Sequence, residues 1–284
     1  MLEVIPEMTP ERMIWLGPPR QWTMIHEAVD KSGRVVPPRR VVVYCPPFAE
    51  EEKCSRRLYV ELARKLAKRD IASIRFGYMG TGDSEGDFSM FTVETALDDI
   101  ARTLLFARVR FPDAPLSLFG LRLGGALALR AAPQTAGVDR LALWEPVTNG
   151  RSYVRMNIRR KSIRQMINAG AAAEPALPTT DEIFDFDGYP VAQAAWNQIE
   201  ALDAAAPAGW PGSALIISVS AGTRASAPCV TLAGALESSG VPTRLDHVTA
   251  QPFWNLLGLV DCPEILELTA GWLAQDSPVD GNER

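Results

Sequence analysis

The stretch PLSLFGLRLGG at residues 115–125 decides the fold of this chain. Its first half is an apolar run typical of a buried strand, and the Ala- and Leu-rich residues 125–132 that follow have the composition of a helix. Gly120 and Gly124 flank the segment between them, so the chain turns sharply as it passes from strand to helix. The pattern predicts a strand, a tight turn with Arg122 at its apex, and a helix.

Strand, Gly-flanked turn and helix are the setting of a nucleophile elbow, which has the pattern G-x-S-x-G. Here the glycines are present, and Arg122 stands between Leu121 and Leu123 where the serine would be. A guanidinium stays protonated at any working pH, so it cannot attack a carbonyl carbon. We therefore expect strained backbone dihedrals at Arg122 without the nucleophile that usually carries them.

Two further motifs accompany this turn. An apolar run at residues 71–76 leads into GYMGTGDSEGD at 77–87, and a buried-strand run at 41–45 ends in PPFAEE at 46–51. Over residues 39–275 the chain resembles α/β-hydrolases of the serine aminopeptidase type, which carry a D-x-x-G-x-G-x-S-x-G loop after the fourth strand; Gly77 stands in place of the leading Asp. The motifs are also similar to those of hydrolase-like proteins associated with exosortase gene clusters.

The resemblance implies an α/β-hydrolase fold, with a mainly parallel central sheet, helices on both faces and a small cap insertion. The hydrophobic patterns agree, because strand-like and helical segments alternate along the chain. We expect strands at 22–29, 34–45, 138–144, 215–219 and 241–248, and helices at 55–69, 92–108, 225–238 and 263–275. Thr92 is the expected N-cap of the second helix, and Pro228 should lie in the first turn of the third.

A single domain spanning residues 1–284 is the simplest organisation for this length, with residues 149–210 as a cap or lid insertion. This cap segment opens with Arg151, Arg155 and Arg159, which share a helix face, so they form either a solvated surface or a positive rim that faces a pocket, a partner protein or lipid headgroups. It continues with an expected loop at 171–178 and an expected helix at 191–202.

Ester or amide hydrolysis on this fold requires a nucleophile, a histidine base and an acid that orients the histidine. The acid normally follows the strand at 215–219, but residues 220–224, SAGTR, contain no carboxylate. The histidine normally follows the last strand, but residues 249–254, TAQPFW, contain none. We interpret His26 as structural, and His247 as either structural or pocket-lining. The triad is therefore predicted to be absent.

The partner of Arg122 determines what the elbow does. Glu145 follows the strand next to the elbow in the expected sheet order and is the first candidate, with Glu50 or Glu51 next. One hypothesis is a structural ion pair that fills the former catalytic site. The other is that Arg122 and the elbow amides recognise an anionic group. The residues expected at this elbow or ligand site are Arg122, Leu121, Leu123, Glu145, Pro47 and Phe48.

Composition excludes several classes of function. A net charge of −5 and a pI near 5.3 argue against nucleic-acid binding. Four cysteines lack metal-ligand spacing; Cys45 and Cys54 could pair, but reduced thiols in a cytoplasmic protein are favoured. Gly80 and Gly82 are not followed by the G-K-[ST] of a phosphate loop, and no apolar run has the length of a membrane span. We expect neither a metal nor a cofactor.

These observations favour a hydrolase-like protein with a degenerate triad that binds an acidic or acyl small molecule, or a partner protein. One alternative is an active acyl-ester or amide hydrolase, or an acyltransferase, that uses unorthodox residues such as Arg122 and Glu145. The other is a structural interaction module in an exopolysaccharide or exosortase-linked pathway, which the resemblance alone suggests. A homo-oligomer is compatible with each of them.

Overall fold

A computed structural model describes residues 10–169, 183–204, 209–256, 258 and 260–275. Its centre is an eight-stranded sheet in the order β1-β2-β4-β3-β5-β6-β9-β10, and a separate two-stranded sheet joins β7 to β8. The strands are β1 (Glu11–Leu16), β2 (Gln21–His26), β3 (Arg40–Cys45), β4 (Ile71–Phe76), β5 (Leu116–Leu121), β6 (Val138–Trp144), β7 (Ile183–Phe186), β8 (Tyr189–Ala192), β9 (Ser213–Ser220) and β10 (Thr243–Thr249).

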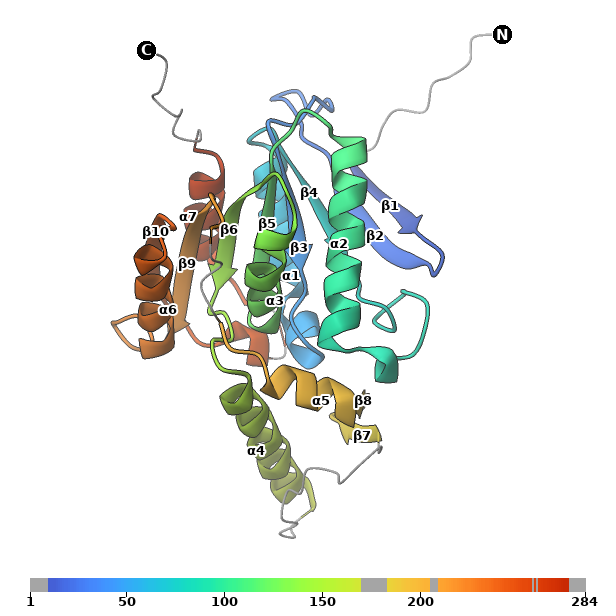
Figure 1. The fold of residues 1–284 in the computed structure, drawn as a ribbon, viewed down its shortest axis with the longest axis vertical. Helices are drawn as coiled ribbons and strands as arrows, with labels where there is room; N and C mark the ends of the chain where they lie inside the picture. Colours follow the sequence, from blue (N-terminus) through green and yellow to red (C-terminus); the bar gives the residue numbers. More distant parts are fainter. Residues whose placement is uncertain (1–9, 170–182, 205–208, 257, 259, 276–284) are drawn as a thin grey trace.

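Helices cover both faces of the sheet, and the strands from β4 to β10 are parallel neighbours. In Figure 1, α2, α3 and α6 lie on the near face, while α1 and α7 lie behind. Two apolar cores fill the spaces between these layers. The helices are α1 (Glu50–Ala67), α2 (Val93–Arg110), α3 (Leu123–Ala131), α4 (Gly150–Ala169), α5 (Gln193–Glu200), α6 (Ala227–Ser238) and α7 (Pro263–Leu273), with 3-10 turns η1 (Phe88–Met90), η2 (Ala132–Gln134) and η3 (Phe253–Asn255). The predicted α/β-hydrolase architecture is confirmed.

Local chemistry explains where several helices begin. Thr92 caps α2 as predicted, in a reciprocal capping box with Thr95. Ser226 caps α6 by accepting a hydrogen bond from the Cys229 amide, and Pro228 lies in the first turn, where its missing N–H costs nothing. The first helix was expected from residue 55 but begins at Glu50, because three acidic residues in its first turn interact favourably with the helix dipole.

Other boundaries differ from the prediction. The strand expected over 34–45 is confined to β3, and β1 was not predicted; it pairs with β2 as an antiparallel hairpin at the sheet edge. The hairpin β7–β8 was also missed. Its turn consists of Asp187 and Gly188, both with positive φ, which is the Asp-Gly signature of a type I′ turn.

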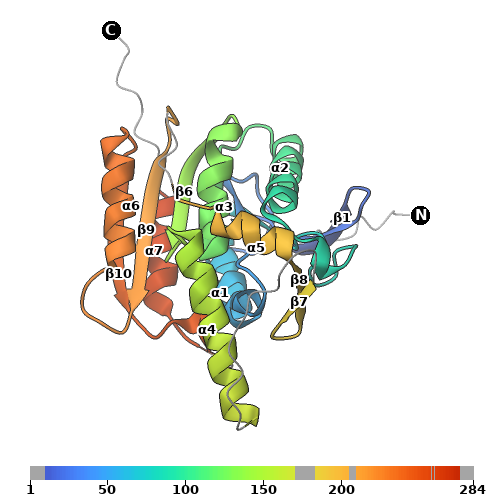
Figure 2. The same ribbon diagram turned by 60° about the horizontal axis from the view of Figure 1, so that its bottom comes forward.

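The cap segment leaves the sheet at the end of β6 and returns at the start of β9. In both views α4, α5 and the β7–β8 hairpin lie together beyond the end of the sheet, and α4 projects furthest from the body (Figures 1 and 2). The predicted helix at 191–202 corresponds to α5, whereas the predicted loop at 171–178 lies outside the described residues. Among the described residues, no helix is long and apolar enough to cross a bilayer.

Two strand-to-helix junctions lie side by side in the sheet, at the ends of the paired strands β3 and β5. The first junction turns at Ala49 with φ 53° and ψ −126°, and the second turns at Arg122 with φ 54° and ψ −121°. These dihedrals are unfavourable for any residue with a Cβ atom, so packing around both turns must maintain them.

Candidate functional site

The elbow has the predicted geometry, with Arg122 as the single residue between β5 and α3. Close backbone packing accounts for the neighbouring glycine, because a Cβ atom at Gly124 would lie 2.1 Å from the Cys45 carbonyl oxygen. The side chains of Leu121 and Leu123 are fully buried in the two opposite cores. Neither leucine is therefore accessible to a ligand at this site.

The guanidinium of Arg122 is enclosed, with the side chain only 12% exposed. Its Nε lies 3.5 Å from Oε1 of Glu51, and its Nη1 donates a hydrogen bond of 3.1 Å to the Glu145 backbone oxygen. The rings of Tyr153 and Trp254 lie 5.5 Å and 5.1 Å from the guanidinium carbon, within cation–π range. The cation at the apex is therefore already partnered by groups of this chain.

The first candidate partner, Glu145, does not form the expected carboxylate pair. Its carboxylate turns toward β9 and α6, where it accepts hydrogen bonds from Ser218 Oγ at 2.9 Å, Val219 N at 2.8 Å and Ser226 Oγ at 2.8 Å. The Cys229 thiol approaches it at 3.6 Å. Because these donors satisfy the carboxylate, only the backbone oxygen of Glu145 serves Arg122. The predicted pairing is corrected on this point.

Glu51, the reserve candidate, is the actual carboxylate partner. Its side chain is 6% exposed and also accepts a hydrogen bond of 2.8 Å from the Tyr153 hydroxyl. Burial raises the pKa of Glu51, while the charge of Arg122 and the Tyr153 hydrogen bond oppose that rise. Burial is the largest of these influences, so the pKa of Glu51 stays above its ordinary value in spite of the neighbouring guanidinium.

A shallow hollow lies beside this ion pair; its empty space of about 350 Å³ includes space open to solvent, and the part that a water-sized sphere can enter is only about 20 Å³. It is formed by the start of α1, the inner face of α4, the β7–β8 hairpin and η3; its lining residues are Phe48, Glu50, Glu51, Tyr153, Asn157, Arg160, Phe186, Asp187, Trp254 and Asn255. Three of these residues also contact Arg122, so the hollow adjoins the guanidinium, which does not itself line it. Of the expected site residues, Phe48 lines the hollow and Pro47 does not.

Two hydrogen-bond donors in the hollow were not predicted. Asn157 is 3% exposed, and its Nδ2 has no hydrogen-bond partner of normal geometry. Arg160 is half-buried and makes no hydrogen bond or ion pair with another described residue. Both follow Tyr153 at the spacing i+4 and i+7, which places them on one face of α4. That spacing was readable in the sequence, but the prediction was confined to the face of this helix that carries Arg151, Arg155 and Arg159.

Comparison with known proteins identifies the family. Residues 36–179 match the sequence profile of the family described as serine aminopeptidase, S33. The chain belongs to this family. No curated protein matches it.

Solved structures show the same fold at low sequence identity. Est1E from Butyrivibrio proteoclasticus with ferulic acid bound superposes with a TM-score of 0.62 at 15% identity, covering 90% of this chain and 93% of that one. XC6422 from Xanthomonas campestris, an α/β serine hydrolase without lid, superposes with a TM-score of 0.55 at 17% identity, covering 93% of this chain and 92% of that one. A thermostable carboxyl esterase from Bacillus coagulans in complex with glycerol superposes with a TM-score of 0.57 at 14% identity, covering 84% of this chain and 89% of that one.

Both histidines of this serine aminopeptidase-family chain lie outside the hollow. His26 is buried in β2, where Arg75 Nε lies 3.0 Å from its Nε2, and burial lowers its pKa to about 4. His247 lies within β10, with its Nε2 3.1 Å from Ser220 Oγ. Cys45 does not pair with Cys54, and burial raises the pKa of the Cys45 thiol far above its usual value. The described residues contain no cluster of potential metal ligands.

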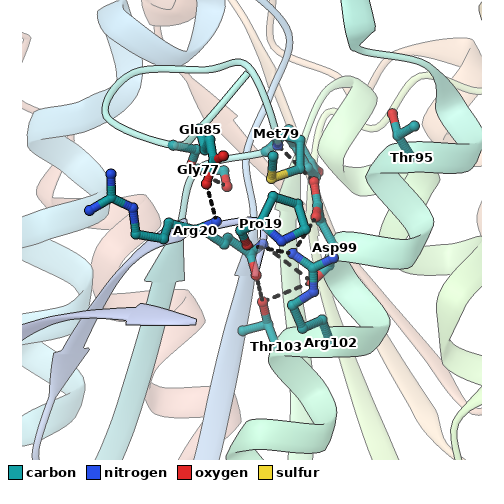
Figure 3. A network of polar contacts seen from close by, with 12 residues as sticks. Pro19, Arg20, Gly77, Met79, Glu85, Thr95, Asp99, Arg102 and Thr103 are labelled. Carbon is teal, nitrogen blue, oxygen red and sulfur yellow. Dashed lines mark hydrogen bonds and ion pairs between the residues drawn. The ribbon is translucent and has the colours of Figure 1, made fainter. Parts of the chain in front are cut away.

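The Gly-rich loop of the family is structural in this chain. Ser84 Oγ donates to the Gly77 carbonyl at 2.9 Å, and a Cβ atom at Gly77 would lie 2.9 Å from that hydroxyl, so the chain packs closely across the loop. Figure 3 shows how the loop is held: the Glu85 carboxylate accepts from the Arg20 amide at 2.8 Å, and the Met79 amide donates to Asp99 at 2.7 Å.

Proposed function

We propose that this family member does not hydrolyse esters or amides through a serine triad, and that it binds a small organic anion in the hollow under α4. The observation that carries the proposal is the state of the elbow apex. Arg122 stands in place of the nucleophile, and Glu51, the Glu145 carbonyl and two aromatic rings already occupy its guanidinium. The apex therefore offers neither an attacking atom nor an unpaired charge.

The ligand class follows from the lining of the hollow. Arg160 makes no hydrogen bond or ion pair with another described residue, the buried Nδ2 of Asn157 has no hydrogen bond of normal geometry, and a guanidinium binds carboxylate or phosphate well. Phe48, Phe186 and Trp254 provide apolar walls. Since three acidic side chains also line the hollow, a ligand with several negative charges is disfavoured. The enterable volume of about 20 Å³ has room only for the head of such a ligand, so the best candidate is a single carboxylate or phosphate whose aromatic or acyl body lies at the open side of the hollow.

The catalytic half of the proposal is tested with a fluorophosphonate probe and p-nitrophenyl esters, alongside an active serine esterase of the same fold. We expect no labelling and no turnover above background. Arg122→Ser should remain inactive, because no base is placed to activate the new hydroxyl. Saturable turnover by the wild-type protein that is lost in Ser84→Ala or Cys45→Ala would contradict the proposal.

The binding half is tested by thermal melts with benzoate, short-chain fatty acids, phosphate and citrate. Ligands that bind the native state raise the melting temperature, so we expect a shift with the monocarboxylates. Arg160→Gln should abolish the shift. Arg159→Gln is the matched control, since Arg159 is exposed on the outer face of the same helix. Equal shifts in both variants, or none in the wild type, would show that the hollow is not the binding site.

A second candidate function is an acyl hydrolase or transferase that uses non-standard residues. The observation in its favour is the Ser220 Oγ to His247 Nε2 distance of 3.1 Å, since a hydroxyl hydrogen-bonded to an imidazole is the smallest nucleophile–base unit. Neither residue lines the hollow, and no described acid hydrogen-bonds to the other ring nitrogen. Fluorophosphonate labelling that disappears in Ser220→Ala and in His247→Ala would favour this candidate.

A further inference from the structure

Helix α4 concentrates positive charge in a chain that is otherwise acidic. It contains six basic residues and no acidic one: Arg151, Arg155, Arg159, Arg160, Lys161 and Arg164. The net charge of the whole chain is −5 and that of α4 is +6, so the residues outside α4 have a net charge of −11. A charge segregated in this way generates an external field that attracts anionic partners to α4 and repels them from the rest of the surface.

The two faces of α4 have different surroundings. Tyr153 and Asn157 are buried and line the hollow, whereas Arg151, Arg155 and Arg159 are exposed on the opposite side. Two apolar side chains lie along one side of this row, three residues before and four residues after Arg159, and are exposed as well, Met156 to 38% and Ile163 to 47%. In both views α4 projects from the body, so part of its length lies away from the sheet domain (Figures 1 and 2).

Among the described residues, no carboxylate neutralises the outward arginines. Arg151, Arg155 and Arg159 make no ion pair or hydrogen bond with another described residue. Exposed arginines elsewhere do pair, for example Arg64 with Glu11 at 2.6 Å and Arg57 with Asp261 at 2.7 Å. Within the described part of the chain, the outward face is thus a row of cations without a carboxylate partner, spaced about one helical turn apart and flanked on one side by apolar side chains.

We propose that the outward face of α4, defined by Arg151, Arg155, Met156, Arg159 and Ile163, binds the surface of an anionic phospholipid bilayer. Each basic side chain close to such a surface contributes about 1 kcal/mol, and exposed apolar side chains can enter the headgroup region. The acidic remainder of the chain is repelled, which orients the molecule with α4 against the membrane. The same helix forms one wall of the hollow, so the hollow then lies close to the bilayer.

A lipid surface fits these side chains better than a folded protein does. An anionic bilayer presents mobile headgroups, so a row of arginines needs no matching geometry, and the apolar side chains beside them find a hydrocarbon boundary. A second copy of the chain could offer its acidic surface instead, but that surface would leave Met156 and Ile163 against charged groups. The inference does not depend on the proposed ligand of the hollow.

The test is co-sedimentation of the full chain with vesicles of phosphatidylcholine alone or with about one third phosphatidylglycerol. We expect binding only to the anionic vesicles, and weaker binding at high salt. The outward triple variant should lose at least about tenfold in affinity, since three favourable charges become repulsive. Its substitutions are Arg151→Glu, Arg155→Glu and Arg159→Glu.

The matched control changes the net charge equally on other exposed surfaces, through Arg12→Glu, Lys31→Glu and Arg130→Glu. It should bind like the wild type, while the double variant Met156→Ser/Ile163→Ser should bind more weakly. Circular dichroism melts verify that every variant is folded. Absence of wild-type binding, or equal losses in the two triple variants, would overturn the proposal. So would binding to polyglutamate or self-association through α4 without vesicle binding.

Discussion

Replacing Arg122 by alanine tests whether the elbow is a structural ion pair. The substitution leaves the Glu51 carboxylate buried, with only the Tyr153 hydroxyl as a donor. Removing one partner of a buried pair costs about 3–5 kcal/mol, because the remaining charge is uncompensated. The lost hydrogen bond to Glu145 adds about 1 kcal/mol. Glu51 can relieve part of the penalty by taking up a proton, so we expect a total loss of about 3–5 kcal/mol at pH 8.

The pH dependence identifies the carboxylate responsible. The pKa of Glu51 is raised by burial and lowered by Arg122, so it rises further in Arg122→Ala. The folded variant then binds more protons than the folded wild type in the mildly acidic range. Its stability deficit should therefore be smaller at pH 5 than at pH 8. Urea unfolding followed by circular dichroism at the two pH values measures both deficits.

A double-mutant cycle completes the test. Arg122→Ala/Glu51→Gln contains no uncompensated charge, so it should be more stable than Arg122→Ala alone by at least about 1 kcal/mol. If Arg122→Ala lies within about 1 kcal/mol of the wild type at pH 8, or the deficits of the two single variants simply add, Arg122 and Glu51 do not form a stabilising pair.

Three other substitutions test the surrounding structure by urea unfolding. Arg122→Gly should be more stable than Arg122→Ala by about 1 kcal/mol, since glycine tolerates the φ of 54°; a less stable glycine variant would contradict the strained turn. Burial raises the pKa of Asp99 to about 6, so ionisation of Asp99 lowers the stability of the wild type as pH rises from 4 to 7. The free energy of unfolding of Asp99→Asn should therefore rise by up to about 3 kcal/mol relative to that of the wild type over this range. Asp98→Asn, at an exposed position, should show no such rise. Gly124→Ala should lower the free energy of unfolding by about 3 kcal/mol or fail to fold, because the new Cβ atom would meet the Cys45 carbonyl oxygen. Gly234→Ala, with open space around its Cβ position, should be neutral or stabilising. Equal effects of the two substitutions would refute the close approach at the elbow.

The fold was predictable because local signals agreed with the global architecture. Apolar runs marked the central strands, and the Gly-flanked turn located the elbow with the correct apex residue. The segments missed were those with weak or mixed periodicity. In the edge strand β1, apolar and polar residues do not alternate, and β7 and β8 have only four residues each. Asp187-Gly188 nevertheless carried a turn signal from which the β7–β8 hairpin could have been predicted.

The site was predicted only in part, because side-chain partners depend on packing that the sequence does not display. Sheet order placed Glu145 next to the elbow, but it could not show that Ser218 and Ser226 would satisfy its carboxylate. Glu51 was ranked behind Glu145 as a partner, and the helix was expected to begin only at residue 55. Once α1 begins at Glu50, the second residue of the helix is directed toward Arg122. Helix start points thus decided which acid became the partner.

The twin turns at Ala49 and Arg122 also have a consequence for the lifetime of the native state. Glu51 and Arg122 are 71 residues apart, and their turns can hold unfavourable dihedrals only after β3 and β5 have paired. Contacts that form after the folding barrier slow unfolding and leave the folding rate unchanged. Stopped-flow measurements on Arg122→Ala should accordingly show faster unfolding with unaltered refolding. The ion pair between Arg122 and Glu51 would then set the unfolding rate, and with it the lifetime of the folded chain.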